Sequence, residues 1–199
     1  MVNQPLLINA GCGSSGAERT PKLFEHWRHL RIDVDPAVAP DVIADITDLS
    51  AVADNSADAL WTSHCIEHLY KHQIPVALRE FWRVLKDDGF AIIIVPDIQT
   101  VARFVAEDRL GDVLYQSAAG PVTPHDVFYG LGTAVAAGNE HMAHKSAFTP
   151  KTLMETIRDA GFPEFVIRRR ENLELAAIAR KSPWPNPQYR NALMEALKL

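Results

Sequence analysis

The sequence has only two cysteines, Cys12 and Cys65, among its 199 residues. Two cysteines cannot build the disulfide framework of a small secreted domain, and the N-terminal residues lack the basic and apolar regions of a secretory signal. No apolar run approaches the roughly 20 residues that span a bilayer. We therefore expect a cytoplasmic protein with reduced thiols and no membrane contact.

Positive charge is also scarce. The chain has 20 Lys and Arg against 25 Asp and Glu, a formal net charge of -5. Without a net basic charge, binding to nucleic acid requires a local basic patch. The one basic run is residues 168–170, and a solvated face is at least as good an interpretation of it as a binding patch. We therefore expect no nucleic-acid partner.

What the sequence does contain is an alternation of short apolar runs and segments with helical spacing. The runs typical of buried strands are 5–10, 30–34, 41–45, 57–63 and 87–97. Helices are expected from Pro21 to about His29 and over 73–86, 100–110 and 149–162. The runs 164–170 and 174–181 stand too close for a crossover helix and should pair antiparallel at the sheet edge. This alternation predicts an α/β fold with a doubly wound parallel sheet and its ligand at the carboxyl ends of the strands.

The remaining segments show less pattern. Residues of about 108–148 mix Gly, Pro, His and aromatics without a sustained period, and we expect a long loop insertion with at most one helical turn. Residues 1–182 are interpreted as a single domain. Residues 183–199 then form a Pro-rich linker and a short C-terminal helix.

The glycine-rich stretch "LLINAGCGSSG" suggests a nucleotide site. Gly11, Gly13 and Gly16 fit the G-x-G-x-x-G pattern of dinucleotide-binding folds, and Asp33 follows at the distance of a ribose-binding acid. In the dinucleotide pattern the helix begins at the glycines, so that its amides face a pyrophosphate. A helix that begins only at Pro21 favours a ligand without phosphates at this turn.

Several motifs, in order, resemble one family. "LLINAGCGSSG", "RIDVDP", "ADITDL", "ADALWTSHCIEHL" and "FWRVLKDDGFAIIIVPD" resemble the successive motifs of class I S-adenosylmethionine (SAM)-dependent methyltransferases, of the small, single-domain, methyltransferase-11-like kind. The resemblance covers nearly all of residues 6–180. It implies a Rossmann-like sheet of seven strands, mostly parallel with an antiparallel final strand. It also implies SAM as cofactor and S-adenosylhomocysteine as product.

The resemblance also implies which residues hold SAM. The cofactor-binding candidates are Asn9, Ala10, Gly11, Gly13, Asp33, Asp45, Ile46 and Ser63. Asp33 would accept hydrogen bonds from the ribose hydroxyls, with Asp35 as its rival, and Asp45 would receive the adenine amino group. Asn9 departs from the acid usual in the family, which weakens the attraction to the ammonium group of SAM.

The acceptor and its chemistry are less constrained. His64 and His144 are the candidate catalytic bases, because an oxygen acceptor needs a base that titrates near neutral pH. The motifs of DNA methyltransferases are missing, which favours a small molecule, a sugar or a lipid-linked intermediate as acceptor for O- or N-methylation. The protein is expected to be a monomer or homodimer. "HCIEH" matches an inverted zinc-protease motif, but no third ligand is evident and no metal is expected.

Two other functions stay open. One is an NAD-dependent oxidoreductase or epimerase, which usually carries a Tyr and Lys relay one helical turn apart, whereas Tyr70 and Lys71 are adjacent. The other is a catalytically silent protein that binds SAM.

Overall fold

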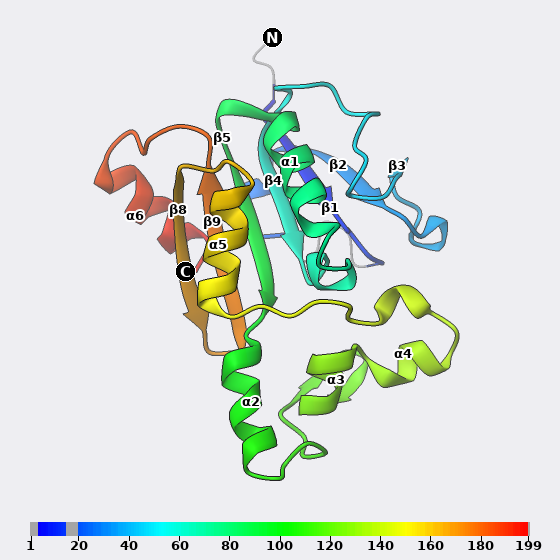
Figure 1. Cartoon of the computed structure of the whole chain (residues 1–199). Coiled ribbons are helices and arrows are strands. Elements are labelled where there is room, and N and C mark those ends of the chain that lie inside the picture. The colour runs from blue at the N-terminus through cyan, green and yellow to red at the C-terminus, as the bar shows by residue number, and fades with distance from the viewer. Residues whose placement is uncertain (1–3, 15–19, 199) are drawn as a thin grey trace.

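The computed structural model describes residues 4–14 and 20–198. A seven-stranded sheet forms its centre, in the order β3-β2-β1-β4-β5-β9-β8 (Figure 1). The strands are β1 (Leu6–Ala10), β2 (Arg28–Asp33), β3 (Val42–Ile43), β4 (Ala57–Ser63), β5 (Leu85–Pro96), β8 (Glu164–Arg170) and β9 (Glu174–Arg180). Neighbouring strands pair in parallel except at β9, which is antiparallel to both β5 and β8. The expected Rossmann-like sheet with an antiparallel final strand is thereby confirmed.

Each face of the sheet buries its own apolar cluster. Successive residues of a strand point to opposite faces, so the continuous apolar run of β5 serves both clusters. Ala91, Ile93 and Val95 pack with α1 (Ile74–Val84) and α5 (Pro150–Asp159) on one face. Phe90, Ile92 and Ile94 pack with α6 (Pro187–Ala196) on the other. Burial on both faces explains why the sequence of β5 shows no polar alternation.

The C-terminal tail contains the short helix that the sequence predicts. The side chain of Asn186 caps α6 by accepting the backbone N–H of Tyr189 at 2.7 Å. Leu193 and Leu197 then pack into the second cluster beside Phe24. Within residues 4–14 and 20–198, no helix has both the length and the apolar character needed to cross a membrane.

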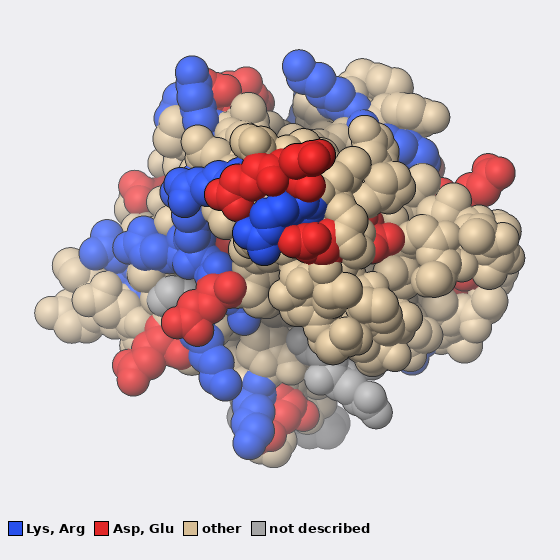
Figure 2. Space-filling model, turned by 90° about the horizontal axis from the view of Figure 1, so that it is seen from below, with Lys and Arg blue, Asp and Glu red and all other residues tan. Residues whose placement is uncertain are grey.

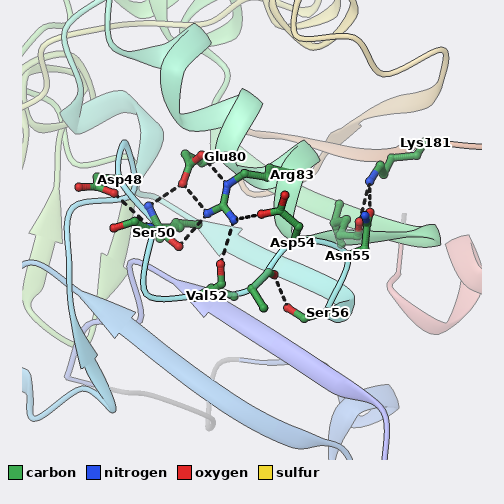
Figure 3. A network of polar contacts seen from close by, with 12 residues as sticks. Asp48, Ser50, Val52, Asp54, Asn55, Ser56, Glu80, Arg83 and Lys181 are labelled. Carbon is green, nitrogen blue, oxygen red and sulfur yellow. Dashed lines mark hydrogen bonds and ion pairs between the residues drawn. The ribbon is translucent and has the colours of Figure 1, made fainter.

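Arg83 fastens α1 to the loop that precedes β4 (Figure 3). Its guanidinium donates to the Glu80 and Asp54 carboxylates and to the carbonyls of Val52 and Leu49, at distances from 2.5 to 2.9 Å. Glu80 in turn accepts the backbone N–H of Leu49 at 2.7 Å. The hydrogen bond from Arg83 holds the pKa of Glu80 below its ordinary value. This network fixes the loop before β4 against α1.

The predicted helix from Pro21 to about His29 is wrong. Only the 3-10 turn η2 (Lys22–Phe24) forms, and β2 already begins at Arg28. Arg28 and His29 pair in register with Leu6 and Leu7 of β1, so residues that the Thr-Pro start signal at Pro21 assigned to a helix belong to the sheet. Without a helix that begins at Pro21, nothing in the described residues of this turn favours a ligand without phosphates. Gly16 lies outside the described residues.

The segment 108–148 is more structured than the predicted loop. It follows α2 (Ile98–Ala106) and contains the hairpin β6 (Tyr115–Ser117) and β7 (Gly120–Val122), the helices α3 (Pro124–Tyr129) and α4 (Gly132–Ala136), and the turn η5 (Glu140–Met142). A capping box between Thr123 and Asp126 begins α3. Val101, Val122 and Val127 form a small separate core that joins the segment to α2. These elements are too short to show a period in the sequence.

Candidate active site

A pocket of about 490 Å³ lies at the carboxyl ends of β1, β2 and β4. Loops that follow parallel strands meet at this edge of an open α/β sheet, where such folds bind their ligands. Its wall consists of Gly11, Gly13, Ser14, Asp33, Val34, Asp35, Val38, Ala44, Asp45, Ile46, His64, Cys65, His68, Leu69, Tyr70, Gln73, Asn139, His141, Met142 and Lys145. Five of the residues predicted to bind a cofactor therefore stand on one wall, together with one predicted catalytic histidine.

The glycine turn after β1 allows a close contact with the loop after β4. Gly11 has φ +71°, and a Cβ built on it would lie 2.2 Å from Sγ of Cys65. Gly13 also has a positive φ, +57°, but a Cβ there would meet no atom within 4 Å. Gly11 is thus required by both backbone and packing, whereas Gly13 is required by backbone conformation alone.

Asp33 ends β2 with its carboxylate on the pocket wall. Its Oδ2 accepts the backbone N–H of Gly13 at 2.8 Å, and its Oδ1 accepts that of Asp35 at 3.0 Å. Each carboxylate oxygen has a second lone pair, so both can accept a further hydrogen bond from a ligand. The rival acid, Asp35, also lines the pocket, but its Oδ1 caps the turn η3 (Pro36–Val38) at Ala37.

Asp45 and Ile46 form another part of the wall. Oδ1 of Asp45 accepts both the backbone N–H and the hydroxyl of Thr47, each at 2.8 Å. One oxygen therefore closes the local turn, as a purely structural aspartate would. Oδ2 makes no such bond within residues 4–14 and 20–198 and is left for a ligand.

His64 lies between two carboxylates. Its Nε2 is 2.7 Å from Oε1 of Glu174, and its Nδ1 is 3.4 Å from Oε1 of Glu67. Burial alone would lower the pKa of His64, but the contacts with Glu174 and Glu67 outweigh it and raise this pKa to about 10. His64 is therefore an imidazolium at neutral pH, with both ring nitrogens engaged. Sequence reasoning missed Glu174, which the fold brings to the site from the start of β9.

The other predicted residues stand back from the wall. Asn9 and Ala10 are buried in β1, 3% and 0% exposed, and Ser63 ends β4. His144 is half-buried, and its Nδ1 donates to the carbonyl of Val127 at 2.8 Å. Burial lowers the pKa of His144, which is therefore a neutral imidazole at pH 7.

The insertion supplies wall residues that the sequence did not single out as a group. Asn139, His141, Met142 and Lys145 face the pocket from and beyond η5. Backbone N–H groups of Lys145 and Ser146 donate to the carbonyl of Glu67 at 2.9 and 3.0 Å. This short stretch therefore runs beside the turn after β4 and forms part of the pocket wall.

The basic run 168–170 is largely neutralised by acidic partners. Arg169 donates to the buried Asp97 at 2.8 Å, and Arg170 donates to Glu174 at 3.1 Å. Figure 2 shows Lys and Arg interleaved with Asp and Glu on the left of the lower face, and mostly uncharged residues on its right. A second cavity, of about 690 Å³, lies beside this run, and none of the predicted site residues lines it. The charges thus give no concentrated basic patch for a nucleic acid on this face.

Comparison with known proteins assigns part of the sequence to a domain family. Residues 8–93 match the model described as a methyltransferase domain. This range contains the glycine turn, the aspartates at the ends of β2 and β3, and the loop after β4. No curated protein matches the chain.

Solved structures share the fold at low sequence identity. A SAM-dependent methyltransferase from Archaeoglobus fulgidus has a TM-score of 0.60 and 16% identity, over 89% of this chain and 86% of that one. A SAM-dependent methyltransferase from Thermotoga maritima, a possible histamine N-methyltransferase, has a TM-score of 0.58 and 15% identity, over 92% and 84%. The 1,6-didemethyltoxoflavin-N1-methyltransferase of Burkholderia thailandensis, with its substrate and S-adenosylhomocysteine bound, has a TM-score of 0.54 and 15% identity, over 90% and 72%.

Proposed function

We propose that this chain, a SAM-dependent methyltransferase with the class I fold, transfers the methyl group of SAM to an oxygen or nitrogen atom of a small molecule. The observation that carries the proposal is the carboxylate of Asp33, which Gly13 holds at the pocket wall. The domain match favours SAM over NAD, which the glycine pattern alone could not do.

The wall offers a partner for each part of SAM. Gly11 and Gly13 leave the backbone open to the methionine part, because no side chain stands there. The carboxylate of Asp33 suits the two ribose hydroxyls. Oδ2 of Asp45 and the backbone of Ile46 suit the adenine edge. Asn9, Ala10 and Ser63 are proposed to contribute from behind this wall, by shaping the turn that the methionine part contacts.

The protein's task in the reaction is to position the acceptor and to exclude water. SAM, when bound, supplies a methyl group that its sulfonium already makes electrophilic. Holding the acceptor in line can supply much of the acceleration, since well-oriented reactions reach effective molarities of about 10⁵ M and more. The wall residues of the insertion, His141 and Met142 among them, enclose the acceptor side.

The two candidate bases differ in their chemistry. His64 has no free ring nitrogen, because a carboxylate lies at each of them, so it cannot accept a proton from an acceptor. We propose that it positions the loop after β4 against Glu174. His144 is neutral and donates through Nδ1, so its Nε2 could accept a proton, but it stands behind the pocket wall. An amine acceptor, which enters neutral, would need no base.

The proposed acceptor is a small molecule, a sugar or a lipid-linked intermediate. Charges on the lower face alternate in sign, which gives no track for a phosphate backbone. The free thiols Cys12 and Cys65 support the proposed cytoplasmic location. A monomer or homodimer remains our proposal for the assembly.

Calorimetric titration with S-adenosylhomocysteine and with NAD tests the donor site. We expect S-adenosylhomocysteine to bind more tightly than NAD and Asp33→Asn to weaken its binding at least tenfold, which corresponds to about 1.4 kcal/mol. Asp35→Asn is the matched control, because Asp35 lies on the same wall and is expected to change the affinity less. Tighter binding of NAD, or no effect of Asp33→Asn, would overturn the donor assignment.

Transfer of a labelled methyl group from SAM to candidate acceptors tests catalysis. Amines, hydroxylated small molecules and sugars should be tried as separate sets. Labelled product from one set identifies the acceptor class. If S-adenosylhomocysteine binds but no set is methylated, a protein that binds SAM without catalysis becomes the better interpretation.

A further inference from the structure

A buried carboxylate without a hydrogen-bond donor lies behind the pocket. The Glu67 side chain is 1% exposed, and neither of its oxygens accepts a hydrogen bond within the described part of the chain. Its nearest ion-pair partner is Nδ1 of His64 at 3.4 Å, and His64 is bound more closely by Glu174 at 2.7 Å. Burying a carboxylate is costly unless a cation compensates it at close range. The imidazolium of His64 supplies part of this compensation, but its closer contact is with Glu174, and the oxygens of Glu67 still lack a donor at hydrogen-bond distance among the described residues.

Two histidines face Glu67 with defined ring orientations. Nδ1 of His68 donates to the carbonyl of Ala143 at 3.1 Å, and Nδ1 of His144 donates to that of Val127 at 2.8 Å. A carbonyl oxygen only accepts, so Nδ1 of each ring carries a proton. The ring nitrogen that can bind a metal is then Nε2, as in histidines that bind metals and donate their other N–H to a backbone carbonyl.

The three side chains converge. One ring nitrogen of His68, one of His144 and one carboxylate oxygen of Glu67 all lie within 4.8 Å of one another. Ligands at about 2.1 Å from a tetrahedral zinc ion stand about 3.4 Å apart. Small rotations of the side chains would bring the three ligand atoms from this separation to the distances that zinc requires. The rings of His68 and His144 already meet edge to face, with centroids 4.8 Å apart.

We propose that Glu67, His68 and His144 bind one divalent transition-metal ion of the zinc class. Two imidazole nitrogens and one carboxylate are a donor set that zinc and its neighbours in the first transition row accept, and three protein ligands leave a coordination position open. The backbone bonds from Lys145 and Ser146 to Glu67 hold the two ligand-bearing segments together without the ion. The metal would join the turn after β4 to the insertion.

This site differs from the inverted protease motif that the sequence suggested. That motif pairs His64 with His68, but the structure binds His64 to Glu174 and brings His144 to the cluster instead. The missing third ligand therefore comes from the insertion. The expectation of no metal site rested on its absence from the local sequence.

Cobalt binding tests the proposal on the whole chain, freed of metal by a chelator. We expect one Co²⁺ per chain with visible absorption typical of low coordination number, and displacement of the ion by Zn²⁺. Glu67→Gln and His144→Ala should each weaken binding at least 100-fold, beyond the roughly 10–100-fold effect of losing an outer-shell partner. His141→Ala is the matched control, since His141 lies on the same segment but outside the cluster, and it should bind as the parent does.

Loss of binding must be distinguished from loss of the fold. Circular dichroism shows whether each variant folds, and the conservative Glu67→Gln variant keeps the side-chain volume of Glu67. Titration with S-adenosylhomocysteine in the same preparations separates this site from the donor site, because the metal proposal does not depend on SAM. No Co²⁺ binding by the parent chain, or equal binding by all variants, would overturn the proposal and leave the His64 imidazolium as the charge that compensates Glu67.

Discussion

Replacing Gly11 by alanine tests the contact between the glycine turn and the loop after β4. At φ +71° an L-residue costs about 1–2 kcal/mol, and the new Cβ would lie 2.2 Å from Sγ and 2.8 Å from Cβ of Cys65. Overpacking of this kind typically costs about 1–3 kcal/mol. Gly11→Ala should therefore lower the free energy of unfolding by about 2–5 kcal/mol.

Gly13→Ala is the matched control for this variant. Gly13 has a similar φ, +57°, but nothing lies within 4 Å of the added Cβ, so only the backbone cost of about 1–2 kcal/mol is expected. Urea denaturation gives the unfolding free energy of both variants, and the difference between Gly11→Ala and Gly13→Ala is the cost of the steric clash with Cys65. In a Cys65→Gly background, which removes both clashing atoms, the cost of Gly11→Ala should fall by about 1–3 kcal/mol. Equal costs for the two glycines, or no change in that background, would refute the steric argument.

Two further predictions concern partly buried ion pairs. Arg83→Met should lower the free energy of unfolding by about 2 kcal/mol, because Glu80 and two carbonyls lose their donor. The pKa of Glu80 is lowered in the folded state, so Glu80 contributes stability above its ordinary pKa and loses this contribution as pH falls through the folded-state pKa. Chemical denaturation across acidic pH should therefore show a smaller loss of unfolding free energy in Arg83→Met than in the parent protein. Asp97→Ala should lower the free energy of unfolding by about 1–3 kcal/mol, because the 1% exposed Asp97 caps α2 and pairs with Arg169. Thermal denaturation should show a smaller loss of stability for Arg169→Met than for Asp97→Ala, because the Arg169 side chain is 48% exposed and water can solvate its position. A larger loss for Arg169→Met would contradict this order.

The central strands could be predicted because their signal is local and strong. β4 occupies the predicted residues 57–63, and the predicted 87–97 run largely coincides with β5. Both strands are buried on two faces and read as continuous apolar runs. The prediction for the segment 21–29 failed for the opposite reason: a Thr-Pro helix start is a weak local preference, and pairing of β2 with β1 overrode it.

In the candidate site, too, residues marked by a local sequence signal could be predicted and the others could not. Gly11, Asp33 and Asp45 each lie at or just after the end of a strand, so a sequence motif marks them and the parallel topology gathers them. The partners of the histidines carry no such mark. Glu174 begins the final strand and His144 belongs to the insertion, and only the tertiary fold brings them to the turn after β4.

This division bears on how the acceptor pocket could be read from sequence. The proposed donor side of the pocket is built from strand ends, where position in the chain determines position in space. The proposed acceptor side is built from the insertion, which is held by contacts with single groups such as the carbonyl of Glu67 and the imidazole of His68. On this proposal, a substitution that breaks these few contacts moves the acceptor wall while the donor wall stays in place. Acceptor specificity is then to be sought in the contacts between 139–146 and the turn after β4, and not in the residues of the sheet.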